Sequence, residues 1–186
     1  NNDYTRRYGS MHKDMKEILF TQEQISERCK ELGAQISKDY EGKKILLIGL
    51  LKGSIPFLAE LSKYIEGDVY FDYMSVSSYK GTESGTIHIK KDVDIDVKGM
   101  DVLIVEDILD TGKTLDTVTH MLKDRGTASC EIVTMLDKQE ARKYPVQAKY
   151  VGFPVPELFV VGYGLDFDQR FRNLPYIGVL KEECYQ

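Results

Sequence analysis

The chain has few cysteines, no long apolar run and no excess of positive charge, and each shortage excludes a class of protein. The three cysteines, Cys29, Cys130 and Cys184, are odd in number and far apart, which argues against a disulfide framework and a cysteine-bound zinc site. No apolar run approaches the ~20 residues needed to cross a bilayer. The net charge of −5 argues against nucleic acid as a partner.

The first ten residues are polar and lack the apolar stretch of a secretory signal peptide. We expect residues 1–10 to be an addition ahead of a native start at Met11. With so few cysteines, the chain is expected to be a cytoplasmic protein with reduced thiols and no membrane partner. Its 186 residues suit a single domain, which we place at residues 11–186.

Apolar runs alternate with helical patterns along the chain, which is typical of a parallel α/β sheet. The run at 45–51 is apolar throughout, as in a strand that is buried on both faces. Residues 78–91 are polar and predict a long exposed loop. Further strands are expected at 69–77, 101–105, 129–136, 150–153 and 159–162, and helices at 23–40, 55–64 and 113–125. Ligands of such sheets bind at the carboxyl ends of the strands.

The most informative segment is the end of the strand at 101–105 and the turn Asp110-Thr111-Gly112-Lys113-Thr114 that opens the next helix. Backbone N–H groups and the positive end of the helix dipole collect at such a turn and favour a phosphate. Gly112 has no Cβ to block a close approach, and Thr111 and Thr114 add hydroxyl donors.

Glu106 and Asp107 lie between this strand and the turn. Carboxylates repel a nearby phosphate unless a cation or sugar hydroxyls lie between them, so the segment predicts a phosphorylated sugar with Mg²⁺, which prefers oxygen ligands. Gly112-Lys113-Thr114 copies the end of a Walker P-loop, but the four-residue spacer between glycines is missing. A general ATP-binding protein is therefore disfavoured.

Residues 102–114 resemble the phosphoribosyl diphosphate signature of type I phosphoribosyltransferases, and flanking segments narrow the resemblance to the hypoxanthine-guanine branch. The resemblance extends from about Lys16 to Tyr185. It implies an α/β domain with a central, mostly parallel sheet flanked by helices, and a small hood formed by the N-terminal segment and C-terminal residues. It also implies a homodimer or homotetramer.

The activity that this resemblance implies is a Mg²⁺-dependent step of purine salvage. The 5-phosphoribosyl group would pass from phosphoribosyl diphosphate to a 6-oxopurine base, hypoxanthine or guanine, giving IMP or GMP and pyrophosphate. By resemblance, Asp110 manages the N7 proton of the purine as the catalytic acid–base group. Glu106 and Asp107 hold the ribose hydroxyls and are expected at the metal. Asp166 lies near the metal through coordinating water.

The resemblance also assigns residues to pyrophosphate and to the lid. Lys52 and Gly53 belong to the pyrophosphate loop. In that family the peptide before this lysine is often cis, and whether Leu51–Lys52 is cis stays open. Arg172 also matches a pyrophosphate contact, with Arg170 as the competing candidate. Ser78 and Tyr79 resemble the start of a lid that shields the reacting centre from water.

The purine side of the site is assigned to three residues by the same resemblance. Lys138 would reach the 6-oxo oxygen, Phe159 would stack on the base, and the Val160 backbone would bond its polar edge. Leu158 departs from the family, because it stands where other members have lysine or an acidic residue. The preference among hypoxanthine, guanine and xanthine therefore stays open.

Two other functions share parts of this pattern. One is a phosphoribosyltransferase for another base, such as xanthine or a pyrimidine, which would differ in the purine pocket. The other is a regulator that keeps the fold but binds RNA or senses nucleotides. The acidic net charge and the full set of catalytic residues disfavour the regulator.

Overall fold

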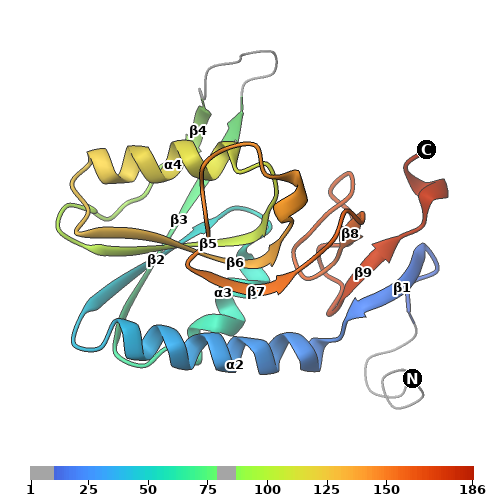
Figure 1. Ribbon diagram of the computed structural model, residues 1–186, viewed down its shortest axis with the longest axis horizontal. Coiled ribbons are helices and arrows are strands. Elements are labelled where there is room, and N and C mark those ends of the chain that lie inside the picture. Colours follow the sequence, from blue (N-terminus) through green and yellow to red (C-terminus); the bar gives the residue numbers. More distant parts are fainter. Residues whose placement is uncertain (1–10, 79–86) are drawn as a thin grey trace.

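The computed structural model describes residues 11–78 and 87–186, which form a large sheet, a small sheet and three helices (Figure 1). The expected addition at 1–10, and Tyr79, lie outside the described residues. The large sheet has the order β4-β3-β2-β5-β6-β7. Its strands are β2 (Lys44–Leu50), β3 (Asp68–Ser78), β4 (Ile87–Lys91), β5 (Asp101–Leu109), β6 (Ser129–Asp137) and β7 (Tyr150–Pro154). All neighbours are parallel except β4, which pairs antiparallel with β3.

Helices cover both faces of this sheet, as the predicted fold class requires. Helix α4 (Lys113–Asp124) lies on one face, and α2 (Gln22–Asp39) and α3 (Ile55–Ser62) lie on the other (Figure 1). There are two short 3₁₀ turns in the described chain. The first, η1 (Gln139–Ala141), follows β6, and the second, η2 (Glu182–Cys184), lies near the C-terminus.

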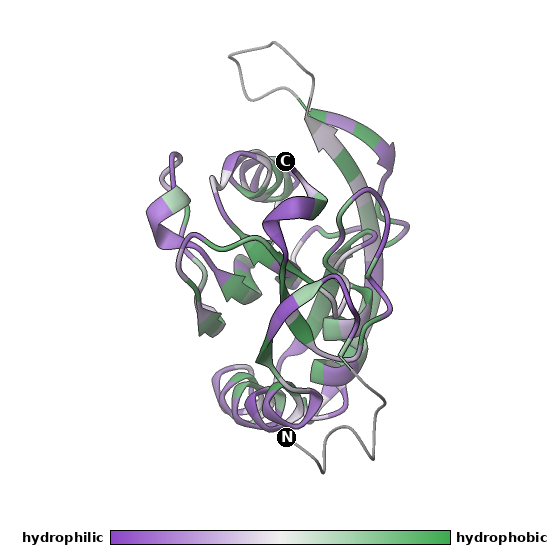
Figure 2. Ribbon diagram, turned by 90° about the vertical axis from the view of Figure 1, so that its right-hand side faces the viewer, coloured by the Kyte–Doolittle hydropathy of each residue, from purple (hydrophilic) through white to green (hydrophobic). Residues whose placement is uncertain are grey.

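Strand β2 shows why a continuous apolar run suits the centre of the sheet. Successive side chains of a strand point to opposite faces, so Ile45 and Leu47 enter the core beneath α2 and α3. Leu46 and Ile48 enter the core beneath α4. Each buried side chain of this size contributes about 1.5–3 kcal/mol. Figure 2 accordingly shows hydrophobic strands between helices whose outer sides are hydrophilic.

Helix α2 begins with a capping box. The Thr21 side chain accepts a hydrogen bond from the backbone N–H of Gln24 at 3.2 Å, and the Gln24 side chain accepts one from the backbone N–H of Thr21 at 2.8 Å. This reciprocal capping box satisfies two amides of the first turn. The buried residues of α2 include Ile25, Cys29, Leu32 and Ile36, which recur at helical spacing and form one face of the helix.

The structure corrects three expectations. Residues 87–91 are not loop but strand β4, because β3 continues to Ser78 and supplies a pairing edge. Strand β5 does not end at Val105 but runs to Leu109, since β6 pairs with it through Glu106 and Ile108. Two strands were not expected, β1 (Met15–Phe20) and β9 (Ile177–Leu180), because each depends on the other as a partner from the far end of the chain.

The small sheet has the order β1-β9-β8, with β8 at Val160–Val161. We call this sheet and the loop at residues 162–176 the hood. A separate core of Met15, Val161, Phe171, Tyr176 and Leu180 holds it together. Figure 1 shows the hood beside the end of the large sheet where β5 and β6 finish. Within the described ranges, no helix is long and apolar enough to span a bilayer.

The three thiols should differ sharply in reactivity. Cys29 and Cys130 are buried, and burial raises the pKa of the Cys29 thiol to about 12 and that of Cys130 to about 11. Both stay protonated at pH 8, whereas a thiol must ionise to react. We predict that an aromatic disulfide reagent at pH 8 modifies only the half-buried Cys184 in the native protein. Rapid reaction of the Cys184→Ser variant would contradict this.

Candidate active site

One cavity lies at the carboxyl ends of β2 and β5, between the large sheet and the hood. Its volume is about 280 Å³. Three segments supply most of its lining: the loop after β2, the end of β5 with the start of α4, and the hood loop. The lining includes Lys52, Gly53, Glu106, Asp107, Asp166, Arg172 and all five residues of Asp110–Thr114.

The start of α4 forms one wall of this cavity. Gly112 is the N-cap residue with φ 83°, a left-handed conformation that favours glycine. Gly112 has no side chain that could cap the helix, and the Lys113 N–H donates to Thr111 Oγ1 at 3.4 Å. The positive end of the helix dipole lies at the cavity. The Asp110 carboxylate accepts a hydrogen bond from the Thr111 N–H at 2.7 Å, which orders the turn. This wall is suited to an anion.

Two carboxylates stand beside that wall on β5. Glu106 Oε1 accepts a hydrogen bond from the Asp107 N–H at 3.0 Å, and Asp107 Oδ1 accepts one from the Ile108 N–H at 2.7 Å. Burial, followed by the nearby charge of Asp107, raises the pKa of the Glu106 carboxyl well above its usual range. The protein thus disfavours two negative charges here, and a cation or hydroxyl groups would relieve their repulsion.

Two cationic side chains converge on the opposite wall. Lys52 Nζ and Arg172 Nη2 each lie 3.3 Å from the same oxygen, Oε1 of Gln169. Arg172 Nη1 donates to the Gly164 carbonyl at 2.6 Å, and Nη2 lies 3.4 Å from Asp166. Its Nε is buried and has no hydrogen-bond partner within the described chain. The two neighbouring positive charges suit an anionic ligand.

Close backbone packing fixes the loop after β2 against the hood. A Cβ added at Gly53 would overlap the Asp107 carboxylate, and one added at Gly164 would overlap the Gly53 carbonyl. The Leu51–Lys52 peptide, whose state the sequence left open, is cis. Lys52, Asp107 and the hood loop are thereby held in one arrangement.

The hood loop has an unusual backbone. Four residues other than glycine have positive φ: Tyr163, Asp168, Gln169 and Phe171. Each such conformation costs about 1–3 kcal/mol and typically persists where function requires it. This loop carries Asp166 and Arg172 to the cavity.

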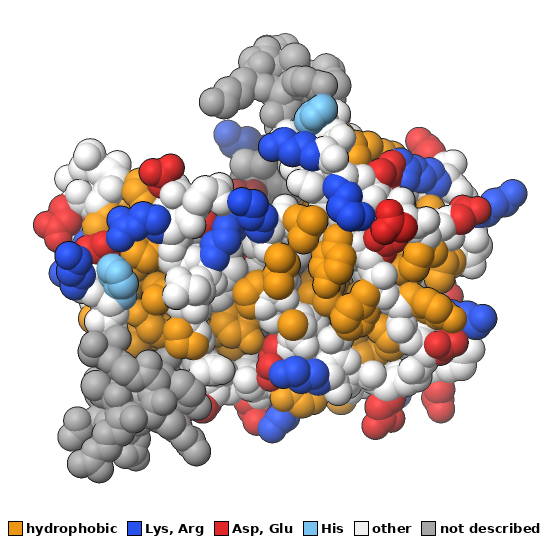
Figure 3. All heavy atoms as spheres, turned by 180° about the vertical axis from the view of Figure 1, so that it is seen from behind, with side chains coloured by type: hydrophobic (Ala, Val, Ile, Leu, Met, Phe, Trp, Pro, Cys, Tyr) orange, Lys and Arg blue, Asp and Glu red, His pale blue; other side chains and the backbone are white. Residues whose placement is uncertain are grey.

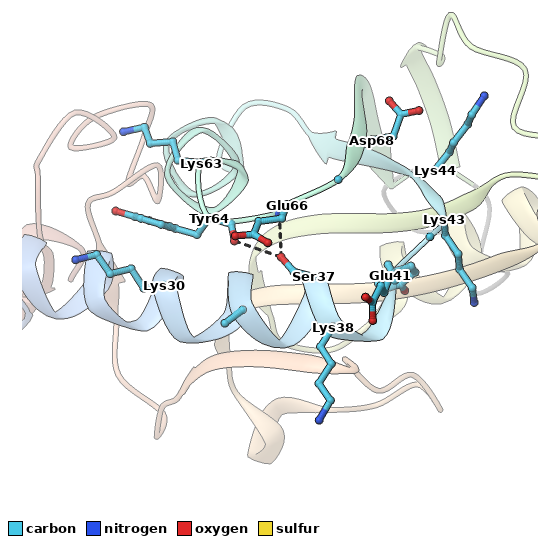
Figure 4. Close-up of a pocket in the computed structure, with 14 residues that line it drawn as sticks. Lys30, Ser37, Lys38, Glu41, Lys43, Lys44, Lys63, Tyr64, Glu66 and Asp68 are labelled. Atoms are coloured by element: carbon cyan, nitrogen blue, oxygen red, sulfur yellow. Dashed lines mark hydrogen bonds between the residues drawn. The ribbon is translucent and has the colours of Figure 1, made fainter.

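A larger hollow, of about 980 Å³, lies at the opposite edge of the sheet, next to the starts of β2 and β3. It has several lysines, but Figure 4 shows Lys38 and Lys43 pointing down and Lys44 to the upper right, away from one another. Glu41, Glu66 and Asp68 also line it. Lys30 and Lys63 are paired with Glu27 and Glu60. The smaller cavity, where charged groups from separate segments meet, is therefore the candidate site.

Comparisons with known proteins agree with this geometry. The family model described as phosphoribosyl transferase domain matches residues 16–168. The hypoxanthine-guanine phosphoribosyltransferase of Streptococcus pneumoniae is 53% identical over 177 residues, which cover 94% of this chain and 98% of the relative. This chain belongs to the hypoxanthine-guanine phosphoribosyltransferase family.

Solved structures support the same family. A hypoxanthine phosphoribosyltransferase from Staphylococcus aureus has a TM-score of 0.92 and 51% identity, with 95% of this chain and 97% of that chain covered. The enzyme from Trypanosoma cruzi, solved with its product IMP, has a TM-score of 0.91 and 40% identity, with 95% and 100% covered.

The family resemblance assigns three residues to the purine, and none of them is among the described residues that line the cavity. Lys138 follows β6, and its backbone N–H donates to the Leu109 carbonyl at 2.9 Å. Phe159 is 37% exposed and stacks on Tyr185 at a centroid distance of 4.6 Å. Val160 is buried and pairs with Val179. The lid residue Ser78 ends β3, and Tyr79 lies outside the described residues.

The three acids expected on the metal side, Glu106, Asp107 and Asp166, all line the cavity. Within residues 11–78 and 87–186, however, no three histidine, cysteine or acidic side chains form a ready-made metal cluster. This is compatible with Mg²⁺, which commonly uses one or two carboxylates and completes its shell with substrate phosphates and water.

Two side chains at the site were missed by the sequence analysis. Gln169 bridges Lys52 and Arg172 through one oxygen, and Arg142 bonds the backbone of Asp110. No short sequence pattern marks either residue. Gln169 lies in an irregular loop and contacts Lys52 from far along the chain, and Arg142 contacts Asp110 across 32 positions. In contrast, Glu106, Asp107 and the turn at Asp110–Thr114 could be found because they lie together in one short stretch of sequence.

Proposed function

We propose that this chain transfers the 5-phosphoribosyl group of phosphoribosyl diphosphate to hypoxanthine or guanine, a step of purine salvage that yields IMP or GMP and pyrophosphate. The observation that carries this proposal is one cavity with an anion-binding helix start, paired carboxylates and two convergent cations. A phosphorylated sugar diphosphate needs all three. The names of the relatives support the choice of base.

The reaction is a displacement at the anomeric carbon of the ribose. A ring nitrogen of the purine forms the new bond while the bond to the pyrophosphate oxygen breaks, and pyrophosphate leaves with the electron pair. Lys52 and Arg172 offset its charge, and Gly53 allows the loop to approach. The Asp110–Thr114 turn anchors the 5′-phosphate, while Glu106 and Asp107 hold the ribose hydroxyls, so the reacting atoms stay aligned. Asp110 accepts the N7 proton of the base and returns it in the reverse direction.

The purine is bound on the hood side of the cavity in this proposal. Lys138 donates to the 6-oxo oxygen, Phe159 stacks on the ring, and the Val160 backbone bonds its polar edge. Leu158 offers no polar side-chain contact. Ser78 and Tyr79 belong to the segment that shields the reacting centre.

Mg²⁺ is the proposed cofactor, because the acids that face the cavity offer only oxygen ligands. Glu106 and Asp107 would hold it together with the substrate, and Asp166 would contact its water. When bound, the ion neutralises charge on the diphosphate. We also propose a cytoplasmic location, where the three thiols would stay reduced.

A panel of free bases tests the activity. Hypoxanthine, guanine, xanthine and a pyrimidine are each mixed with phosphoribosyl diphosphate and Mg²⁺, and the absorbance change is followed. We expect turnover with hypoxanthine and guanine, and its loss when EDTA removes the metal. Turnover with the pyrimidine alone, or salt-sensitive RNA binding without nucleotide synthesis, would contradict the proposal.

Asp110→Asn tests the acid–base role. The amide cannot accept the N7 proton, so kcat should fall by ~10²–10⁴-fold. The KM for phosphoribosyl diphosphate should change little, because the backbone of the turn remains. The matched control in the same steady-state measurements is Asp116→Asn. Asp116 lies on α4, which follows the turn, and is not among the described residues that line the cavity. An Asp110→Asn enzyme with normal turnover would remove Asp110 from this role.

We further propose that the protein is a homodimer or homotetramer that uses the first part of β3, which β4 does not pair with. Tyr70 and Phe71 on β3 are 38% and 47% exposed. Figure 3 views the molecule from this side and shows hydrophobic side chains gathered across its middle. Exposed apolar surface of this kind typically marks an interface.

Sedimentation velocity tests this assembly. The wild-type protein should sediment as a dimer or tetramer, and Phe71→Asp should shift it toward monomer because a buried charge would be unpaired. Met11→Asp, at an exposed apolar residue away from β3, serves as the control. A monomeric wild type, or a Phe71→Asp variant with unchanged mass, would contradict the proposal.

A further inference from the structure

A buried ion pair lies behind the turn that carries Asp110. Asp137 is the last residue of β6, and Arg142 follows η1. Their side chains are only 3% and 11% exposed, and Arg142 Nη2 donates to Asp137 Oδ1. Asp137 Oδ2 also accepts a hydrogen bond from Gln139 at 3.3 Å. Charged groups are seldom buried this far unless their geometry serves a purpose.

All three nitrogens of the Arg142 guanidinium are used, and they join three segments. Besides the bond to Asp137, Nε donates to the Asp110 carbonyl at 3.0 Å and Nη1 donates to the Val146 carbonyl at 2.8 Å. The planar guanidinium therefore holds the Asp110 peptide at a fixed position relative to the end of β6. Lysine could not reproduce this fork.

The Arg142 side chain also packs against the turn. A Cβ added at Gly112 would overlap Val146 Cγ1 and would lie 3.1 Å from Arg142 Cδ. Arg142 and Val146 thus pack closely against the turn at Gly112. Arg142 is not part of the cavity lining in the described chain, so it acts on the turn from behind.

The phosphate side of the turn has a separate support. The backbone N–H groups of Lys143 and Tyr144 donate to the Thr111 carbonyl at 2.9 and 3.1 Å. These bonds do not need the Arg142 side chain. Loss of that side chain should therefore disturb the Asp110 peptide more than the phosphate-binding part of the turn.

We infer that Arg142, anchored by Asp137, is a positioning residue that fixes the catalytic Asp110 for proton transfer. This inference rests on the proposed function, because it assumes that Asp110 is the acid–base group. It assigns to Arg142 no contact with either substrate. The effect on rate comes from geometry, since a misplacement of about 1 Å at a reacting group can lower a rate by ~10²-fold.

A double-mutant cycle tests the inference in the full-length protein. Arg142→Met removes the fork and keeps an unbranched apolar stem. We expect kcat to fall by ~10- to 100-fold, with the KM for phosphoribosyl diphosphate within about two-fold of wild type. In the Asp110→Asn background the same substitution should lower kcat by less than about two-fold, because the group that it positions is already disabled.

Arg28→Met is the matched control. Arg28 has the same bonding pattern, with Nε and Nη2 donating to the carbonyls of Gly152 and Val151 and Nη1 donating to Glu31. It joins α2 to β7 and does not line the cavity as described. Its substitution should lower the thermal midpoint without lowering kcat.

The outcomes separate the two claims. Unchanged kcat in Asp110→Asn would reject the proposed role of Asp110. A large loss in Asp110→Asn combined with an equal fold-loss from Arg142→Met in both backgrounds would reject the inference alone, as would a loss confined to KM. If Arg142→Met does not fold, Arg142→Lys takes its place in the same cycle, and the same pattern of kcat decides.

Discussion

The apposition of opposite charges around one small cavity is the constraint on which the rest of the structure depends. The positive end of α4 and the carboxylates of Glu106 and Asp107 face the same space. The carboxylates are not satisfied by the protein alone, since the pKa of Glu106 is raised. On the hood side of the cavity, Lys52 and Arg172 place two positive charges close together. A ligand that brings phosphate, hydroxyl groups and a metal together would satisfy both at once.

The two sheets supply different halves of this arrangement. The large sheet brings the acids and the turn to one edge because its parallel strands all finish there. The hood brings Asp166 and Arg172 on a loop whose backbone adopts four unfavourable conformations. Close contact between Gly53 and Gly164 joins the two halves. Rigid packing of this kind is what catalysis by positioning requires.

The sequence could predict what depends on contiguous residues. The apolar run of β2, the capping box of α2 and the acidic segment with the turn at Asp110–Thr114 all lie within short windows, and the structure has the strand, helix and turn in the expected places. Pairing between distant segments could not be predicted in this way. Strands β1 and β9, the bridge made by Gln169 and the ion pair of Asp137 with Arg142 each need the folded chain before their partners meet.

The most direct test of the account is a crystal of this protein soaked with ribose 5-phosphate and Mg²⁺. The account predicts density for the phosphate against the backbone of the Asp110–Thr114 turn, with the ribose hydroxyls next to Glu106 and Asp107. A turn that stays without ligand, while the compound binds elsewhere on the protein, would contradict it.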